Sequence, residues 1–161
     1  MKSLLTAFIN TSSEVLLKNI YGFDLLLFEN DKAVSVHQLE KALQTANYRY
    51  IFSFGQRPLI KNKIHIENKA IIGGEVLDTS FDTARLKGAF EDCGTTVKLS
   101  YNAGTSYCNN IYFHGIKMIS KKCLNTEMVF IHIPYIKNIS CSADFFKSIE
   151  NGINKFLSEA V

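Results

Sequence analysis

The sequence lacks the features that mark several classes of protein. No apolar run is long enough to cross a bilayer, and the apolar stretch at residues 4–8 is too short for the core of a signal peptide. We therefore expect no membrane partner and a cytoplasmic location. No basic stripe interleaved with aromatic residues is present, which argues against a nucleic-acid partner. Internal repeats, linkers and low-complexity segments are also missing.

Cysteine is present, but not in the pattern of a disulfide framework or a metal site. The four cysteines stand at positions 93, 108, 123 and 141, without a CxxC pair or metal-ligand spacing. A zinc site built from Cys108, His114 and Cys123 would have no recognised spacing. We expect reduced thiols, no metal and no cofactor. For Cys93, Cys123 and Cys141 the simplest interpretation is a small apolar residue in the core.

The pattern of apolar residues predicts alternating strands and helices. The chain has 161 residues, 47% of them hydrophobic, which is enough for one sizeable core and short for two. The expected strands are 3–8, 24–28, 48–54, the segment around 64–71, 96–99 and 128–133. The expected helices follow Thr11, span 35–45, 81–93 and 108–118, and begin near 143. This alternation predicts a single three-layer α/β/α domain over residues 1–161, with a twisted, mixed or mostly parallel sheet.

A cysteine and a histidine stand where this fold would present them to a ligand. Gly104 allows a tight turn before a helix that opens at Cys108, where unpaired backbone N–H groups and the helix dipole favour a thiolate. An apolar strand must end at Pro134, which puts His132 near the carboxyl edge of that strand. Ligands of open α/β sheets bind at this edge. The pair is therefore a candidate for cysteine-based nucleophilic catalysis.

The motifs around these residues resemble those of the pyroglutamyl peptidases, the pyrrolidone-carboxylate peptidase family of cysteine peptidases. Residues 103–109 read Ala-Gly-Thr-Ser-Tyr-Cys-Asn, similar to the family's cysteine motif, and residues 130–134 read Phe-Ile-His-Ile-Pro, similar to its histidine motif. The family's catalytic glutamate lies in an apolar segment after a Gly-Gln turn. Here Gly55-Gln56 precedes such a segment, and Glu67 takes the place of the glutamate.

The resemblance implies hydrolysis of the amide bond that follows an N-terminal pyroglutamyl residue. Cys108 would be the nucleophile, His132 the base and Glu67 the residue that orients the base, with a thioester as intermediate. The residues implied to contact the substrate are Phe8, Gln56, Ser106 and Tyr107. The implied partner is a peptide or small amide with a blocked N-terminus. The oligomeric state stays open, a homo-oligomer included.

Departures from the family's pattern affect the substrate pocket. The N-terminal loop is reduced, so that only Phe8 has a counterpart among the family's two pocket phenylalanines. The Gly-Gln turn continues as Arg57-Pro58, and the long loop after the glutamate shrinks to roughly residues 73–79. Peptidase chemistry is thus better supported than pyroglutamate specificity, and we expect weaker substrate selectivity than in full-length members.

Two other interpretations stay open at this point. The chain could be a trimmed homologue that acts on another amide or has lost turnover, or a non-catalytic α/β binding module in which Cys108 and His132 are core residues. Glu67 could face solvent from an alternating strand, and His37 and His65 read as surface positions. Rapid labelling of Cys108 by a thiol reagent at neutral pH, abolished by His132→Ala, would favour an enzyme.

Overall fold

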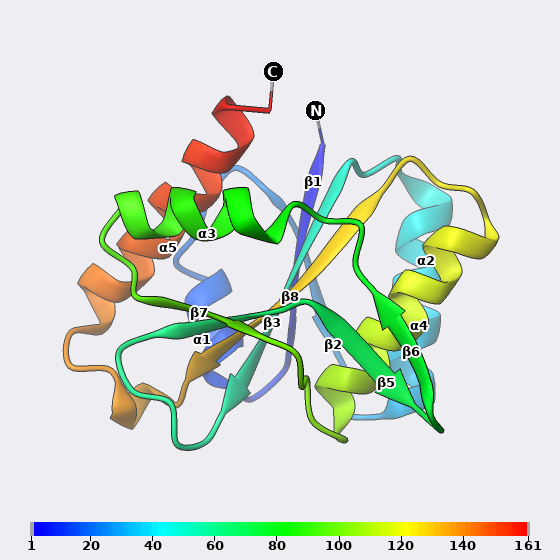
Figure 1. Ribbon diagram of the computed structural model, residues 1–161, viewed down its shortest axis with the longest axis horizontal. Helices are drawn as coiled ribbons and strands as arrows, with labels where there is room; N and C mark the ends of the chain where they lie inside the picture. Colours follow the sequence, from blue (N-terminus) through cyan, green and yellow to red (C-terminus); the bar gives the residue numbers. More distant parts are fainter. Residues whose placement is uncertain (1, 161) are drawn as a thin grey trace.

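A central six-stranded sheet between two layers of helices organises the chain in the computed structural model, which describes residues 2–160 (Figure 1). The strands are β1 (Ser3–Phe8), β2 (Asp24–Phe28), β3 (Tyr50–Arg57), β4 (Ile64–Glu67), β5 (Lys69–Ile72), β6 (Glu75–Asp78), β7 (Val97–Ser100) and β8 (Glu127–Pro134). The helices are α1 (Ser12–Leu17), α2 (Lys32–Thr45), α3 (Thr83–Asp92), α4 (Tyr107–Lys121), the 3₁₀ turn η1 (Ile136–Asn138) and α5 (Ser142–Ser158). The predicted three-layer α/β/α fold is confirmed.

The sheet has the strand order β2-β1-β3-β8-β4-β7 and is mostly parallel. Only the β4–β8 pair is antiparallel, while β5 and β6 form a separate two-stranded hairpin. Because β4 runs against β8, the amino end of β4 meets the carboxyl end of β8, whose other neighbour is the carboxyl end of β3. Gly55 of β3 and His65 of β4 therefore flank His132 of β8 on either side.

Each face of the sheet carries its own apolar core. Helices α1, α3 and α5 cover one face, where Tyr50, Phe52, Phe81 and Phe156 pack as an aromatic cluster (Figure 1). Helices α2 and α4 cover the other face, where Cys108 belongs to the buried cluster. Within residues 2–160, no helix combines the length and the apolar character that crossing a membrane requires.

The segment expected around 64–71 forms two strands, β4 in the main sheet and β5 in a hairpin with β6, and β6 occupies the expected loop at 73–79. The start of α2 also differs from the prediction. The sequence suggests a start at Ser35, whereas the helix begins at Lys32 because Asp31 caps it. The Asp31 carboxylate accepts hydrogen bonds from the backbone N–H groups of Ala33 and Val34 at 2.9 and 2.8 Å. The Ser35 hydroxyl donates instead to the carbonyl of Lys32 inside the first turn.

The expected burial of three cysteines is wrong. Cys123 and Cys141 are exposed and Cys93 is half-buried. Cys123 follows the end of α4 with a φ of 51°, and Cys141 is the N-cap of α5, so both lie at helix boundaries near the surface. Cys108 is the one cysteine of the four that is buried.

Candidate active site

Cys108 lies in the first turn of α4, after the tight turn that the sequence predicts. Gly104 adopts a φ of 84°, which glycine tolerates without strain. Its N–H donates to the side chain of Asn102 at 2.9 Å, which closes the loop before the helix. Ser106 is the N-cap, and its side chain makes no capping hydrogen bond. The Cys108 side chain enters the interface between helix and sheet and is only 9% exposed.

The sulfur of Cys108 sits over Gly55, the β3 residue that pairs with His132. A β-carbon built at position 55 would lie 2.6 Å from Sγ of Cys108. Residues paired in register point to the same face of a sheet, and neighbouring strands lie about 4.8 Å apart. The missing side chain of Gly55 therefore leaves space that the Cys108 sulfur fills, on the face of the sheet to which His132 also points.

Burial dominates the electrostatics of this thiol. It raises the pKa of Cys108 to about 12, and the nearby Glu67 acts in the same direction. The Ser106 hydroxyl, the backbone N–H of Cys108 itself and Arg57 oppose this shift. The thiol is therefore protonated at neutral pH in the free protein. The expected stabilisation of a thiolate by the helix terminus is present but is outweighed by burial.

His132 and Glu67 form a buried pair. Nδ1 of His132 lies 2.8 Å from Oε1 of Glu67, and the two residues are 3% and 0% exposed. Glu67 thus points into the protein, and the alternative in which it faces solvent is wrong. The phenol of Tyr112 in α4 donates to the Glu67 carbonyl at 2.8 Å and ties the strand to the helix that carries Cys108. When Nδ1 donates its proton to Glu67, Nε2 of His132 is an acceptor.

Arg57 also binds Glu67, although the sequence motifs do not single it out as a site residue. Its Nη1 lies 3.1 Å from Oε1, the oxygen that His132 contacts. The signal was available in the alternation of β3, because Gly55 and Arg57 project to the same face. The sequence does not predict the order of the strands in the sheet. This order brings the carboxyl end of β3 within reach of β4.

His65 is a second histidine on this face, and its predicted surface position is wrong. It pairs with His132 across the β4–β8 ladder. Both ring nitrogens are buried without a hydrogen-bond partner within residues 2–160, as is Oε2 of Glu67. Burial lowers the pKa of His65, with Arg57, Lys63 and Lys98 acting in the same direction and Glu67 opposing them. We therefore describe His65 as a neutral imidazole at neutral pH.

A cavity of about 380 Å³ opens beside Cys108 and contains the predicted contact residues. It is lined by Phe8, Ile9, Asn10, Thr11, Asn30, Gly55, Gln56, Pro58, Ser106, Tyr107, Cys108 and Tyr135, all of them uncharged. The rings of Phe8 and Tyr107 pack with centroids 5.8 Å apart. Oε1 of Gln56 accepts from the backbone N–H and the hydroxyl of Ser12 at 2.8 and 2.9 Å, which fixes the side chain at the cavity wall.

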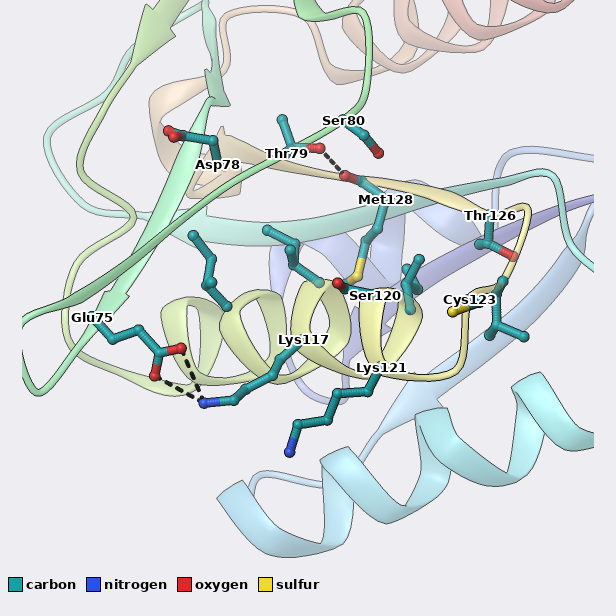
Figure 2. Close-up of a pocket in the computed structure, with 14 residues that line it drawn as sticks. Glu75, Asp78, Thr79, Ser80, Lys117, Ser120, Lys121, Cys123, Thr126 and Met128 are labelled. Carbon is teal, nitrogen blue, oxygen red and sulfur yellow. Dashed lines mark hydrogen bonds and ion pairs between the residues drawn. The ribbon is translucent and has the colours of Figure 1, made fainter.

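A second cavity, of about 570 Å³, lies between β6 and the carboxyl-terminal half of α4 (Figure 2). It contains none of the predicted site residues. At its wall Lys117 pairs with Glu75, and the Thr79 hydroxyl donates to the carbonyl of Met128. Within residues 2–160, no group of three or more His, Cys, Asp or Glu side chains could hold a metal ion.

Comparisons with known proteins point to the same family at the levels of sequence and fold. The sequence profile described as Pyroglutamyl peptidase matches residues 79–147. Pyrrolidone-carboxylate peptidase 2 of Caldanaerobacter subterraneus subsp. tengcongensis is 30% identical over 169 aligned positions, which cover 84% of this chain and 82% of that protein. Pyroglutamyl peptidase I of Bacillus amyloliquefaciens superposes with a TM-score of 0.85 at 20% identity, over 98% of this chain and 97% of that one. Pyrrolidone carboxyl peptidase from Thermococcus litoralis gives 0.82 at 17% identity, over 99% and 94%.

Proposed function

Because the chain belongs to the pyroglutamyl peptidase family of cysteine peptidases, we propose that it hydrolyses the amide bond after an N-terminal pyroglutamyl residue. Cys108, His132 and Glu67 would act as the catalytic triad of one peptidase domain. The observation that carries this proposal is the buried 2.8 Å contact between His132 and Glu67, on the face of the sheet that also carries Cys108, a residue of the cavity wall. The substrate would be a peptide or small amide whose N-terminus is blocked.

The reaction begins with the protonated thiol of Cys108. Nε2 of His132 takes the proton from Sγ of Cys108 as the sulfur attacks the carbonyl carbon of the pyroglutamyl residue. Glu67 stabilises the imidazolium that forms, as the third member of a triad does. The imidazolium then protonates the leaving amine and the C–N bond breaks, which leaves a thioester on Cys108. Attack of water on the thioester, with His132 as base, releases pyroglutamate and restores the thiol.

The negative charge that develops on the carbonyl oxygen needs hydrogen-bond donors. The first turn of α4 supplies unpaired backbone N–H groups next to Cys108. Because Ser12 occupies Oε1 of Gln56, the amide nitrogen of Gln56 is its remaining donor. Removing one such donor commonly lowers kcat by about 10²- to 10³-fold. The uncharged lining of the cavity suits a lactam, which has no charge to neutralise.

Release of a reporter amine from a pyroglutamyl substrate tests the proposal. Cys108→Ser and His132→Ala should each reduce kcat/KM by at least about 10³-fold, and the double variant should be no worse, because the residues act as one unit. Glu67→Gln should reduce it less. Cys123→Ser removes an exposed thiol and should leave the rate unchanged. Equal rates for the wild type and Cys108→Ser would reject the mechanism.

A further inference from the structure

Two cationic or polar groups meet at a single oxygen of the buried carboxylate. Nδ1 of His132 lies 2.8 Å and Nη1 of Arg57 lies 3.1 Å from Oε1 of Glu67. The Glu67 side chain is completely buried, whereas that of Arg57 is 28% exposed. The guanidinium thus reaches from the end of β3 into the interior, past the strand that carries His132.

We propose that Arg57 is a positioning residue of the active site, which acts on His132 through Glu67. The proposal rests on the triad proposed above. A guanidinium donates along fixed directions, so its bond to Oε1 limits the rotation of the carboxylate. The carboxylate in turn sets the orientation of the imidazole. In the sequence, Arg57 stands only in the altered turn after Gly55-Gln56. It is not one of the three residues of the proposed triad.

The charge of Arg57 has a second effect, whose direction follows from electrostatics. A guanidinium on Oε1 offsets part of the negative charge that would otherwise stabilise an imidazolium. It therefore favours the neutral imidazole, which is the form able to accept the proton of Cys108. Removing the charge of Arg57 should keep His132 protonated to higher pH. The acid limb of the pH profile of kcat/KM should then move to higher pH.

Other ionisable groups surround this carboxylate and have to be considered. His65 from β4 and Lys63, which precedes β4, lie on one side, and Lys98 of β7 pairs with His65 in the ladder. Cys108 and Tyr112 approach from α4. His65, Cys108 and Tyr112 are uncharged at neutral pH, because burial lowers the pKa of the imidazole and raises those of the thiol and the phenol. Arg57 is thus the charged group that directly contacts the Glu67 carboxylate.

The chain contains a matched control for this arginine. Arg49 lies at the opposite end of β3, where it pairs with Glu127, and its side chain is 29% exposed against 28% for Arg57. Arg49→Gln therefore removes the same charge and an ion pair beside the amino ends of β3 and β8, at the edge of the sheet away from Cys108. If Arg57→Gln changes the pH profile and Arg49→Gln does not, the change comes from the loss of the contact with Glu67 and not from the loss of a positive charge in general.

The first experiment measures kcat/KM against pH for the wild type, Arg57→Gln, Arg57→Lys and Arg49→Gln. Arg57→Gln should shift the acid limb to higher pH and lower kcat/KM there by about 3- to 10-fold, mainly through kcat. Arg57→Lys should restore part of the shift and Arg49→Gln should show none. In a Glu67→Gln background the effect of Arg57→Gln should vanish. A profile of Arg57→Gln that superimposes on the wild type, or an undiminished effect without Glu67, would overturn the proposal.

A second experiment does not depend on activity. The imidazole of His132 can be titrated by NMR in the wild type and in Arg57→Gln, with its resonance assigned from a His132→Gln variant. The titration midpoint should be higher in Arg57→Gln and unchanged in Arg49→Gln. Identical midpoints in the wild type and Arg57→Gln would reject the role of Arg57 even in an active enzyme. An inactive wild type would count against the proposed function alone, and the NMR titration would still decide on Arg57.

Discussion

Sγ of Cys108 occupies the place that a side chain at Gly55 would take. A β-carbon at position 55 would lie 2.6 Å from the sulfur and 2.8 Å from the ring of Phe130. Real atoms do not approach so closely, so either the thiol or the aromatic ring would have to move. The glycine therefore controls the position of the thiol on the face of the sheet to which its register neighbour His132 also points.

Gly55→Ala should therefore impair both stability and activity. Overpacking of this kind lowers the free energy of unfolding by about 1–3 kcal/mol, and displacement of the thiol should lower kcat more than KM. Gly88→Ala in α3 is the control, because a β-carbon there meets nothing within 4 Å. It should raise stability by up to about 1 kcal/mol and leave activity unchanged. Wild-type kcat in Gly55→Ala would show that the thiol is not held where we describe it.

Thiol labelling should be slow at Cys108. Its buried sulfur and its pKa of about 12 leave little thiolate at neutral pH, whereas Cys123 and Cys141 are exposed. Peptide mapping after brief treatment with iodoacetamide should find the two exposed cysteines modified first. Because a buried thiol can give up its proton to a base only during attack on the substrate, slow labelling of Cys108 does not separate an enzyme from a binding module here. Preferential modification of Cys108 would instead indicate a thiolate–imidazolium pair in the resting protein.

Stability should fall at alkaline pH. Burial raises the pKa of Cys108 to about 12 and also raises that of Tyr112, whereas the unfolded chain ionises at about 8.5 for cysteine and about 10 for tyrosine. Above about pH 8.5 the unfolded state releases protons that the folded state retains, so the free energy of unfolding decreases as pH rises.

Urea unfolding measured between pH 8 and pH 11 tests this dependence. Cys108→Ala should make the decrease less steep by up to about 1.4 kcal/mol per pH unit. Cys123→Ala, which removes an exposed thiol, should leave the slope of the wild type. A slope unaffected by Cys108→Ala would mean that the thiol ionises equally in both states.

Tyr107 should supply one aromatic wall of the substrate pocket. Its ring packs against Phe8 at 5.8 Å between centroids, in a cavity where the shortened N-terminal loop provides a single phenylalanine. Tyr107→Ala should reduce the preference for pyroglutamyl over prolyl substrates by about 10- to 200-fold, and Tyr107→Phe should largely retain it. Tyr101→Ala is the control, because Tyr101 is 60% exposed and lies outside the lining of the cavity. Unchanged selectivity in Tyr107→Ala would exclude this wall.

The selectivity of the wild type should also be weaker than that of a full-length homologue assayed alongside. Loss of one apolar contact in such a pocket changes discrimination by about 10- to 200-fold. We expect a higher KM and a lower ratio of pyroglutamyl to prolyl turnover. Equal values for both proteins would show that the reduced loop around Phe8 does not weaken the pocket.

Local signals predicted several of the strands, whereas the roles of the catalytic candidates stay a prediction. The bounds of β1 and β2 agree with the apolar runs that turn residues delimit, and Pro134 ends β8 as its ring requires. The proximity of Glu67 and His132 could be expected from the resemblance to a family. The start of α2 was misjudged because both Asp31 and Ser35 offer caps, and only the folded chain shows that Asp31 is used.

The interactions that tune the site depend on the order of strands. Arg57 meets Glu67 because β8 lies between β3 and an antiparallel β4, and His65 is half-buried, with its ring nitrogens covered, where it pairs with His132. No local pattern contains this arrangement, since the partners are brought together by long-range pairing. The burial of Cys108 likewise follows from its contact with Gly55, which is more than fifty positions away in the sequence.

The central claim is that Cys108 attacks the substrate and carries the acyl group. Rapid quenching of the enzyme during turnover of a pyroglutamyl amide, followed by proteolysis and mass spectrometry, measures this directly. We predict a pyroglutamyl thioester on the peptide that contains Cys108, formed in step with the first turnover and absent in Cys108→Ser and His132→Ala. Sustained turnover with no acyl group on Cys108, and with full activity in Cys108→Ser, would contradict the account.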